Sequence, residues 1–177
     1  MRKTLNFLYD AAGYLAAFFV FAIFAVMIAQ TVMREFGIRT GGTDDIVAWF
    51  CAASAFLAMA HTFRWGDFVR VTLLLDNLPP RARHIFEVGS LAIAAVFVGY
   101  LAYSTCRFVY ESWQFNDTAN GLIAIPMWIP QMSFVVGALL LFLAVADELF
   151  LVLRGGRPTY VTAMEARHAR GDFSEDV

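Results

Sequence analysis

Charged side chains are scarce in this sequence. Asp, Glu, Lys and Arg make up 16% of its 177 residues, whereas apolar residues make up 60%; a soluble domain carries about 25% and about 45–50%, respectively. Such a composition excludes an ordinary soluble domain, because most of the apolar surface needs a non-aqueous solvent. The net charge of −2 also gives no basic surface for a nucleic acid.

Cysteine and proline are also rare. Cys51 and Cys106 stand far apart in apolar stretches, so neither a metal-ligand spacing nor a redox pair is present. No linker rich in Gly, Ser or Pro divides the chain, and its length favours a single domain. We therefore expect a transmembrane domain over residues 1–153 and a cytoplasmic tail over residues 154–177.

Four windows contain no Asp, Glu, Lys or Arg: residues 11–33, 46–63, 88–106 and 128–146. At 1.5 Å per residue the shortest window reaches about 27 Å as a helix, close to the roughly 30 Å of hydrocarbon in a bilayer. Isolated strands are excluded there, because lipid leaves their backbone groups without hydrogen-bond partners. The sequence therefore predicts an all-α membrane protein with four transmembrane helices.

Lys and Arg are unevenly distributed among the segments that flank these windows. Ten of the 13 lie before the first window, between the second and third, or after the fourth, while the other two loops hold Arg34, Arg39 and Arg107. Cytoplasmic loops carry the excess of Lys and Arg. Both chain ends are therefore expected in the cytoplasm.

The segment over residues 68–78 mixes apolar residues with Arg70, Asp76 and Asn77. It is too short and too polar to cross a bilayer. We expect it to lie along the inner leaflet as a short amphipathic segment, with Pro79 and Pro80 ending it before the third window.

No window carries an ionisable side chain near its middle. Proteins that conduct ions or protons alone usually keep such groups there. The polar residues at depth are expected to hydrogen-bond to neighbouring helices; they are Gln30, Ser54, Ser90, Ser104, Gln131 and Ser133. Asp147 and Glu148, near the inner surface, are expected to snorkel or to pair with Arg154.

The sequence shows no catalytic motif, so neither an enzyme activity nor a catalytic or metal-binding residue is expected. Small residues four apart, such as Gly13 with Ala17 and Ala95 with Gly99, instead favour close helix packing. The sequence leaves open whether that packing is internal or against another chain.

Two alternatives of other classes are considered. His61 and His84 fall near the inner ends of adjacent windows, which leaves open a haem-binding membrane anchor of a respiratory complex. Histidines at the membrane interface without haem are the favoured interpretation. A small exporter that works alone as a homo-oligomer is disfavoured by the charge-free windows.

Two stretches carry a family resemblance. In TDDIVAWFCAASAFLAMAHTFRWGDFVRV, Asp44 and Asp45 open the second window, Trp49 follows one turn later and Arg64 lies near its end. In IPMWIPQMSFVVGALLLF, an Ile-Pro-x-Trp sequence ends at Trp128. With Arg34 after the first window, this order over residues 8–153 resembles the small membrane subunit of tripartite ATP-independent periplasmic (TRAP) transporters, the DctQ-like proteins.

The resemblance implies a scaffold subunit in a bacterial inner membrane. In such systems a periplasmic binding protein captures a solute, commonly a carboxylate, and a large permease subunit moves it inward with sodium. The small subunit would hold no cofactor, with sodium bound in the large subunit only. The resemblance implies roles at the subunit interface or as helix-end anchors for Arg34, Asp44, Asp45, Trp49, Arg64 and Trp128, and it identifies no substrate-binding residue.

Overall fold

The computed structural model describes residues 2–38, 40–65, 79–119, 121, 123–156 and 159. These described residues include four α-helices: α1 (Arg2–Glu35), α2 (Thr43–Trp65), α4 (Pro80–Gln114) and α5 (Trp128–Leu153). Each is long and apolar enough to cross a membrane. The predicted all-α fold with four spans is therefore confirmed.

Two sequence-based expectations concern parts of the chain that the structure does not describe. The predicted amphipathic segment, residues 68–78, lies outside the described residues. The predicted tail begins directly after Leu153, where α5 ends, but most of it is also outside them. Both the segment and the domain boundary stay predictions.

The helices are longer than the charge-free windows. With 34 and 35 residues, α1 and α4 reach about 50 Å at 1.5 Å per residue, well beyond the roughly 30 Å of the hydrocarbon layer. The additional turns carry the charged residues that bounded the windows, such as Asp10 and Glu87. These turns can extend into the headgroup region, where charge is tolerated.

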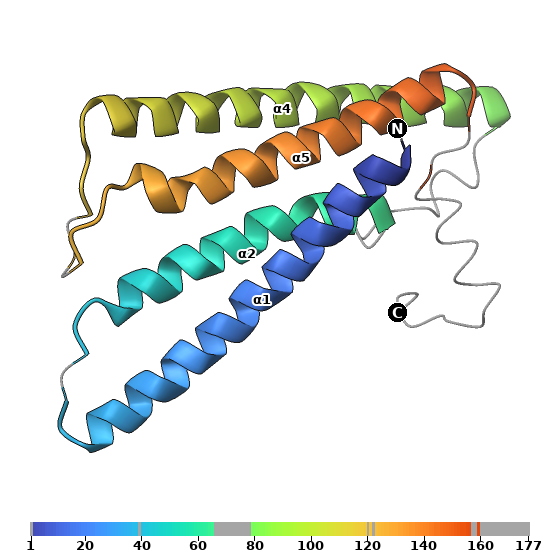
Figure 1. The fold of residues 1–177 in the computed structure, drawn as a ribbon. Coiled ribbons are helices and arrows are strands. Elements are labelled where there is room, and N and C mark those ends of the chain that lie inside the picture. The colour runs from blue at the N-terminus through green and yellow to red at the C-terminus, as the bar shows by residue number, and fades with distance from the viewer. Residues whose placement is uncertain are drawn as a thin grey trace, which may run out of the picture.

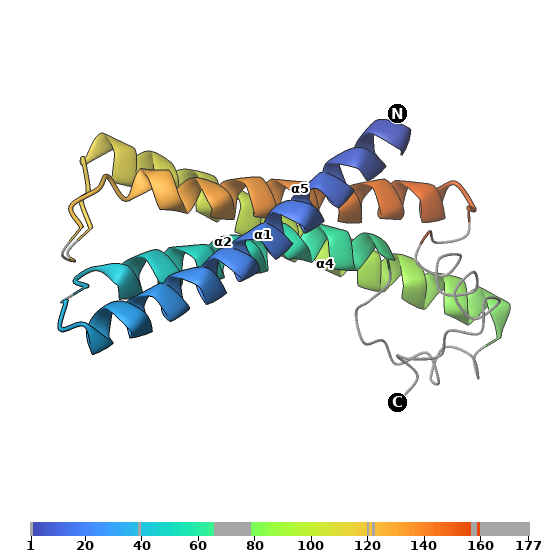
Figure 2. The ribbon, with the colours of Figure 1, turned by 60° about the horizontal axis from the view of Figure 1, so that its bottom comes forward.

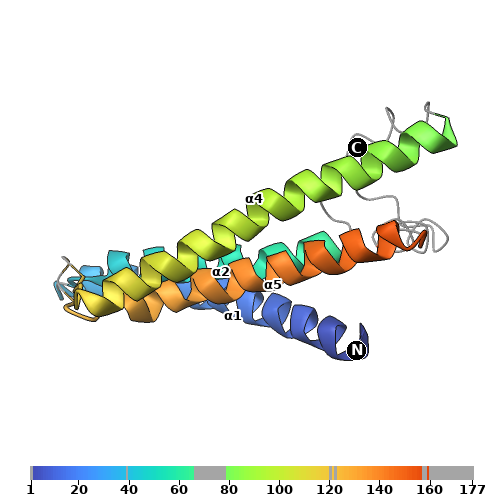
Figure 3. The same cartoon turned by 90° about the horizontal axis from the view of Figure 1, so that it is seen from above.

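The four helices form an open row rather than a closed bundle (Figure 1). α1 packs against α2, α2 against α5, and α5 against α4, so α1 and α4 form the two edges. Seen from above, α1 and α4 diverge from each other towards the end of the row at which both helices begin (Figure 3). An open row leaves more helix surface without a protein neighbour than a closed bundle of four helices does.

The row has two distinct ends. At the hairpin end, residues 36–42 join α1 to α2 and residues 115–127 join α4 to α5; at the terminal end, α1 begins and α5 finishes (Figure 1). Gly37 ends α1 with φ +72°, and the Gly37 N–H and the Ile38 N–H donate to the carbonyls of Arg34 and Met33. Such a cap favours glycine because the left-handed conformation crowds a Cβ atom.

Small residues allow the helices to approach closely. A Cβ atom on Gly137 of α5 would lie 2.4 Å from the backbone oxygen of Phe56 of α2, so the two backbones meet there. On α2 the buried residues Ala53, Leu57 and Ala60 follow one another at helical spacing. The α2–α5 contact is the centre of the row.

The beginning of α1 crosses over towards α5 (Figure 2). Tyr9 is fully buried there, in a cluster with Ala60 of α2 and with Leu141, Ala144 and Val145 of α5. By contrast, large apolar side chains on the outer faces of α1 and α4 are exposed, among them Phe18, Phe21, Phe97 and Tyr100. These faces suit lipid or another protein rather than water.

Candidate functional site

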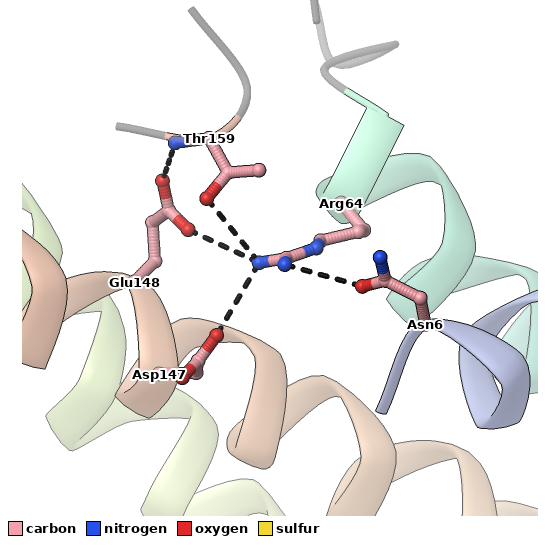
Figure 4. Close-up of polar contacts among 5 residues, drawn as sticks. All are labelled: Asn6, Arg64, Asp147, Glu148 and Thr159. Carbon is pink, nitrogen blue, oxygen red and sulfur yellow. Dashed lines mark hydrogen bonds and ion pairs between the residues drawn. The ribbon is translucent and has the colours of Figure 1, made fainter. Parts of the chain in front are cut away.

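A buried ion-pair cluster at the terminal end joins three helices (Figure 4). Nη1 of Arg64 lies 3.3 Å from Oδ2 of Asp147 and 3.4 Å from Oε2 of Glu148. Nη2 donates to Oδ1 of Asn6, 3.2 Å away on α1. Nη1 also donates to the Thr159 hydroxyl, and the Thr159 N–H donates to Glu148. One guanidinium thus connects α1, α2, α5 and the segment after α5.

The helices bring these side chains together for local reasons. Arg64 lies in the last turn of α2, where a cation is favoured by the partial negative charge of the helix end. Glu148 continues the buried face of α5 through Leu141, Ala144 and Val145, so the helix period directs it into the protein. The Glu148 side chain is only 2% exposed and that of Arg64 only 8%. Each buried charge therefore needs the opposite charge of the other side chain.

From the sequence, Asp147 and Glu148 are expected to snorkel or to pair with Arg154; the pairing is wrong because both contact Arg64, and Glu148 is too deeply buried to snorkel. The Arg154 guanidinium instead lies 4.0 Å above the centre of the Phe150 ring, a cation–π arrangement. Arg154 follows the last residue of α5 and is exposed, whereas the buried face that holds Glu148 looks towards Arg64. The spacing along one helix suggested the wrong partner because burial, rather than sequence distance, selects it.

A second polar group lies nearby, between α1 and α2. Nδ1 of His61 is 3.3 Å from the Tyr9 carbonyl and 3.6 Å from Oδ1 of Asp10, and the indole N–H of Trp65 donates to the same Asp10 oxygen at 3.2 Å. His61 also packs on Gly13, where a Cβ atom would lie 2.8 Å from Nδ1. His61 therefore faces α1.

This arrangement does not support the haem alternative. His84 is on α4, which packs against α5, whereas His61 is directed towards α1 on the other side of α2. Two axial imidazoles must approach one iron from opposite sides. Among the described residues, no group of three or more His, Cys, Asp or Glu side chains is placed to hold a metal ion.

The predicted acidic pair lies at the hairpin end and makes contacts within the chain. Asp44 Oδ1 accepts a hydrogen bond from Nε2 of Gln30, 3.3 Å away on α1. Asp45 lies against the backbone of Gly121 in the α4–α5 connection, where a Cβ atom would be 1.9 Å from Oδ2. These two aspartates connect the beginning of α2 to both neighbouring segments.

The remaining predicted residues lie at helix ends or one turn inside. Arg34 is exposed in the last turn of α1, and its guanidinium has no hydrogen-bond or ion-pair partner among the described residues. Trp49 lies half-buried in the second turn of α2, and Trp128 is the first residue of α5. The structure therefore places Arg34 and Trp128 at helix ends, while Arg64 is far from both, at the other end of the row.

The polar residues within the apolar windows differ in their hydrogen-bond partners. Gln30 hydrogen-bonds to a neighbouring helix, as expected. The hydroxyls of Ser54, Ser90 and Ser133 instead donate to carbonyls three residues earlier in their own helices, so the expectation is wrong for them. Gln131 is 3% exposed, and its Oε1 has no hydrogen-bond partner among the described residues.

The small-residue pairs named above pack within the chain. Gly13 meets His61, and a Cβ atom on Gly99 of α4 would lie 3.0 Å from the Phe142 ring of α5. Ala17, four residues after Gly13, lines a groove of ≈ 550 Å³ between α1 and α2. These pairs therefore take part in helix contacts within the chain.

Asn6, Tyr9 and Thr159 were not singled out from the sequence. Nothing in the pattern marks them, because their importance comes from the crossing of α1 over α5 and from the return of the chain after α5. Glu148 had a detectable signal: an acidic residue that continues an apolar face at helical spacing needs a buried cation.

Residues 23–155 match a protein family described as "Tripartite ATP-independent periplasmic transporters, DctQ component". The match includes α2, α4 and α5 completely, together with both hairpin connections and Arg64, Asp147 and Glu148. No curated protein matches the chain.

Proposed function

The chain belongs to the DctQ family of TRAP transporter components, and on that premise we propose that it is the scaffold of its transporter. In this proposal it supports a large permease subunit in the bacterial inner membrane, with both chain ends in the cytoplasm. The permease takes up a carboxylate-type solute with sodium, and a periplasmic binding protein delivers that solute. The chain itself has no catalytic activity and holds no cofactor.

The position of charge in the helices carries this proposal. Within the described residues, the ionisable groups of the ion-pair cluster and the Asp10–His61 pair lie at the terminal end, and the acidic pair lies at the hairpin end. The middle of each helix contains no Asp, Glu, Lys, Arg or His. Proteins that move ions unaided usually keep ionisable side chains at mid-membrane.

The open row supports the same conclusion from packing. α1 packs mainly against α2 and α4 mainly against α5, and their outer faces expose large apolar side chains. A companion protein can therefore rest against an edge without any rearrangement of the four helices. The contact of Gly137 at the centre and those of Arg64 at one end hold α2 and α5 together.

Uptake in proteoliposomes tests the proposal. The reconstituted chain alone is expected to give no sodium-driven uptake of the solute, and the large subunit together with the binding protein is expected to give little. All three proteins together are expected to restore uptake. The substrate is first identified by the thermal stabilisation of the binding protein with a panel of carboxylates.

Two results oppose the proposal in different ways. Uptake by this chain in the absence of the other two proteins shows that it contains a pathway of its own. Full uptake by the large subunit and the binding protein without this chain shows that no scaffold is required. Absorption by haem in the visible spectrum of the purified chain would instead revive the alternative of a respiratory anchor.

A further inference from the structure

A polar pocket lies at the hairpin end, between α4 and α5, apart from the ion-pair cluster. Its volume is ≈ 460 Å³, and it is lined by residues of the last turns of α4, of the connection and of the beginning of α5. They are Phe108, Ser112, Asn116, Asp117, Thr118, Met127 and Gln131. With the chain ends in the cytoplasm, this pocket is on the outer side of the membrane.

The backbone around the pocket is held by several hydrogen bonds. The Met127 N–H donates to the Asp117 carbonyl at 2.8 Å, and the Asp117 N–H donates to the Ser112 carbonyl at 3.0 Å. Thr118 and Pro126 form an antiparallel bridge. Asn116 has φ +52°, an uncommon conformation for a residue other than glycine. These hydrogen bonds hold together the two ends of the connection, and Asp117, in the first of them, lines the pocket.

One buried group in the pocket lacks a partner. Gln131 is 3% exposed, and its Oε1 accepts no hydrogen bond from the described residues. A buried amide oxygen without a donor costs about 1–3 kcal/mol. Proteins rarely leave such a group unpaired unless a ligand or an ordered water completes it.

The chemistry of the lining selects the class of ligand. Besides Gln131, the polar residues that line the pocket are Asp117, Ser112, Asn116 and Thr118, and no Lys, Arg or His among the described residues lines it. Hydrogen-bond acceptors with one negative charge favour a cationic donor. Phe108 and Met127 provide apolar walls for an aliphatic or planar stem.

Other ligands fit this lining less well. An anionic solute or the phosphate of a phospholipid would lie beside Asp117 without a cation to balance it. A bare metal ion would find a single carboxylate in a space much larger than an ion. An Arg or Lys side chain can donate hydrogen bonds to the carboxylate and the amide oxygen, while its aliphatic stem contacts the apolar walls.

We propose that the pocket between α4 and α5 receives an Arg or Lys side chain of the periplasmic binding protein when that protein docks on the membrane subunits. This inference rests on the proposed function, because it takes the binding protein as the partner on the outer side. The pocket then has a docking role, separate from the contact between the two membrane subunits.

Two variants test the pocket, with a third as a control. Asp117→Asn removes the charge, and Gln131→Leu replaces the amide by an apolar group of similar size. Gln114→Leu makes the same change at the exposed last residue of α4. Each variant is purified with the large subunit in nanodiscs, and the affinity for the binding protein is measured by surface plasmon resonance at several salt concentrations.

We expect Asp117→Asn and Gln131→Leu each to weaken binding on the order of tenfold, as the loss of a hydrogen bond to a charged group does. Asp117→Asn should also reduce the salt dependence of the affinity, because an ion pair is lost. Gln114→Leu should bind like the unchanged chain. A Lys or Arg to Ala scan of the binding protein should find one residue whose effect disappears in Asp117→Asn.

Unchanged affinity of both pocket variants overturns this inference, while uptake by the unchanged complex leaves the proposed function intact. If an amine phospholipid instead copurifies and is lost in both variants, with unchanged binding of the protein, the pocket holds a lipid headgroup and the inference is wrong. If the unchanged complex neither binds the binding protein nor takes up solute, the proposed function fails, and this inference fails with it.

Discussion

Arg64 is the residue on which the terminal end of the row depends most. It brings a single positive charge between Asp147 and Glu148, while Asn6 occupies its second terminal nitrogen. Two carboxylates around one guanidinium leave the cluster with a surplus negative charge. The loss of the cation is therefore more harmful than the loss of either acid.

Arg64→Met should lower stability by about 3–5 kcal/mol, because Glu148 would remain buried without a cation. The measurement is the melting temperature in detergent, followed by tryptophan fluorescence. Arg107→Met is the control: Arg107 also pairs with a carboxylate, Glu111, at 2.7 Å, but both side chains are exposed. No measurable shift is expected there, because water and salt screen such pairs.

Removal of both carboxylates should rescue the Arg64→Met variant if the unpaired negative charge causes its loss of stability. Asp147→Asn and Glu148→Gln together, in the Arg64→Met background, remove the unpaired charges and should recover most of the lost stability. If the combined variant melts no higher than Arg64→Met alone, lost packing of the arginine stem explains the defect, and the importance assigned to charge is wrong.

The contact of Asp45 with Gly121 gives a second prediction at the residue scale. Gly121→Ala should displace the Asp45 carboxylate and lower the melting temperature, because the added Cβ atom would overlap Oδ2. In an Asp45→Ala background the same change should have almost no effect, which corresponds to a coupling of about 0.5–3 kcal/mol. Asp44→Ala is the matched control, since Asp44 contacts Gln30 instead; equal effects of Gly121→Ala in all backgrounds contradict the contact.

At the scale of the helices, the existence of the four spans was predictable and their neighbours were not. Apolar windows without charge, such as residues 128–146, identify a helix in lipid because no other structure satisfies the backbone there. The order α1–α2–α5–α4 depends instead on which faces of the helices interlock. In lipid, apolar faces look alike, so composition does not reveal which face of α5 meets α2.

Site residues at the ends of apolar windows could be predicted from the sequence, whereas those positioned by long-range helix crossings could not. Asp44, Asp45 and Arg64 stand out as charges at the ends of apolar windows, and the structure finds each in a defined contact. Asn6 and Tyr9 gain their neighbours only because α1 crosses towards α5. Long-range crossings of this kind have no local signature in the sequence.

The α2–α5 contact gives a prediction at the scale of the helices. Gly137→Ala should separate the two helices, because the added Cβ atom would lie 2.4 Å from the Phe56 carbonyl oxygen. A backbone atom, unlike a side chain, cannot relieve this overlap by a change of rotamer. The expected loss is about 1–3 kcal/mol. Gly89→Ala on α4 is the control, since no atom lies within 4 Å of its added Cβ, and it should be neutral or slightly stabilising.

Melting temperatures of both glycine variants are compared in the same detergent. Equal stability of Gly137→Ala and the unchanged chain contradicts the close approach of α2 and α5. The comparison also separates packing from helix propensity, because alanine favours a helix at both positions and only one of them is crowded.

At the scale of the whole molecule, the two edges of the row are not equivalent. On α4, Gly99 of the small-residue pair faces Phe142 within the chain. On α1, Ala25 and Ala29 form another pair four residues apart, and both are exposed. Small residues at this spacing let a second helix approach closely in lipid. α1 is therefore the edge at which we expect the large subunit.

Photo-crosslinking tests this asymmetry. A benzophenone amino acid at Phe18, Phe21 and Ile28 of α1 should crosslink to the co-expressed large subunit, whereas one at Phe97 or Tyr100 of α4 should not. All five side chains are exposed, so differences in yield report the neighbour rather than burial. Crosslinks should appear on one face of α1 at helical spacing, because a packed helix contacts a stripe and lipid contacts the whole surface.

The pattern of crosslinks shows whether the choice of edge or the scaffold role itself is wrong. Yield at α4 and none at α1 contradicts the choice of edge but retains a scaffold that rests against the permease. No yield at either edge contradicts the scaffold itself, because the row then lies in lipid on both sides. A scaffold needs one edge covered by protein, and the other edge, left to lipid, widens the area of the complex in the membrane.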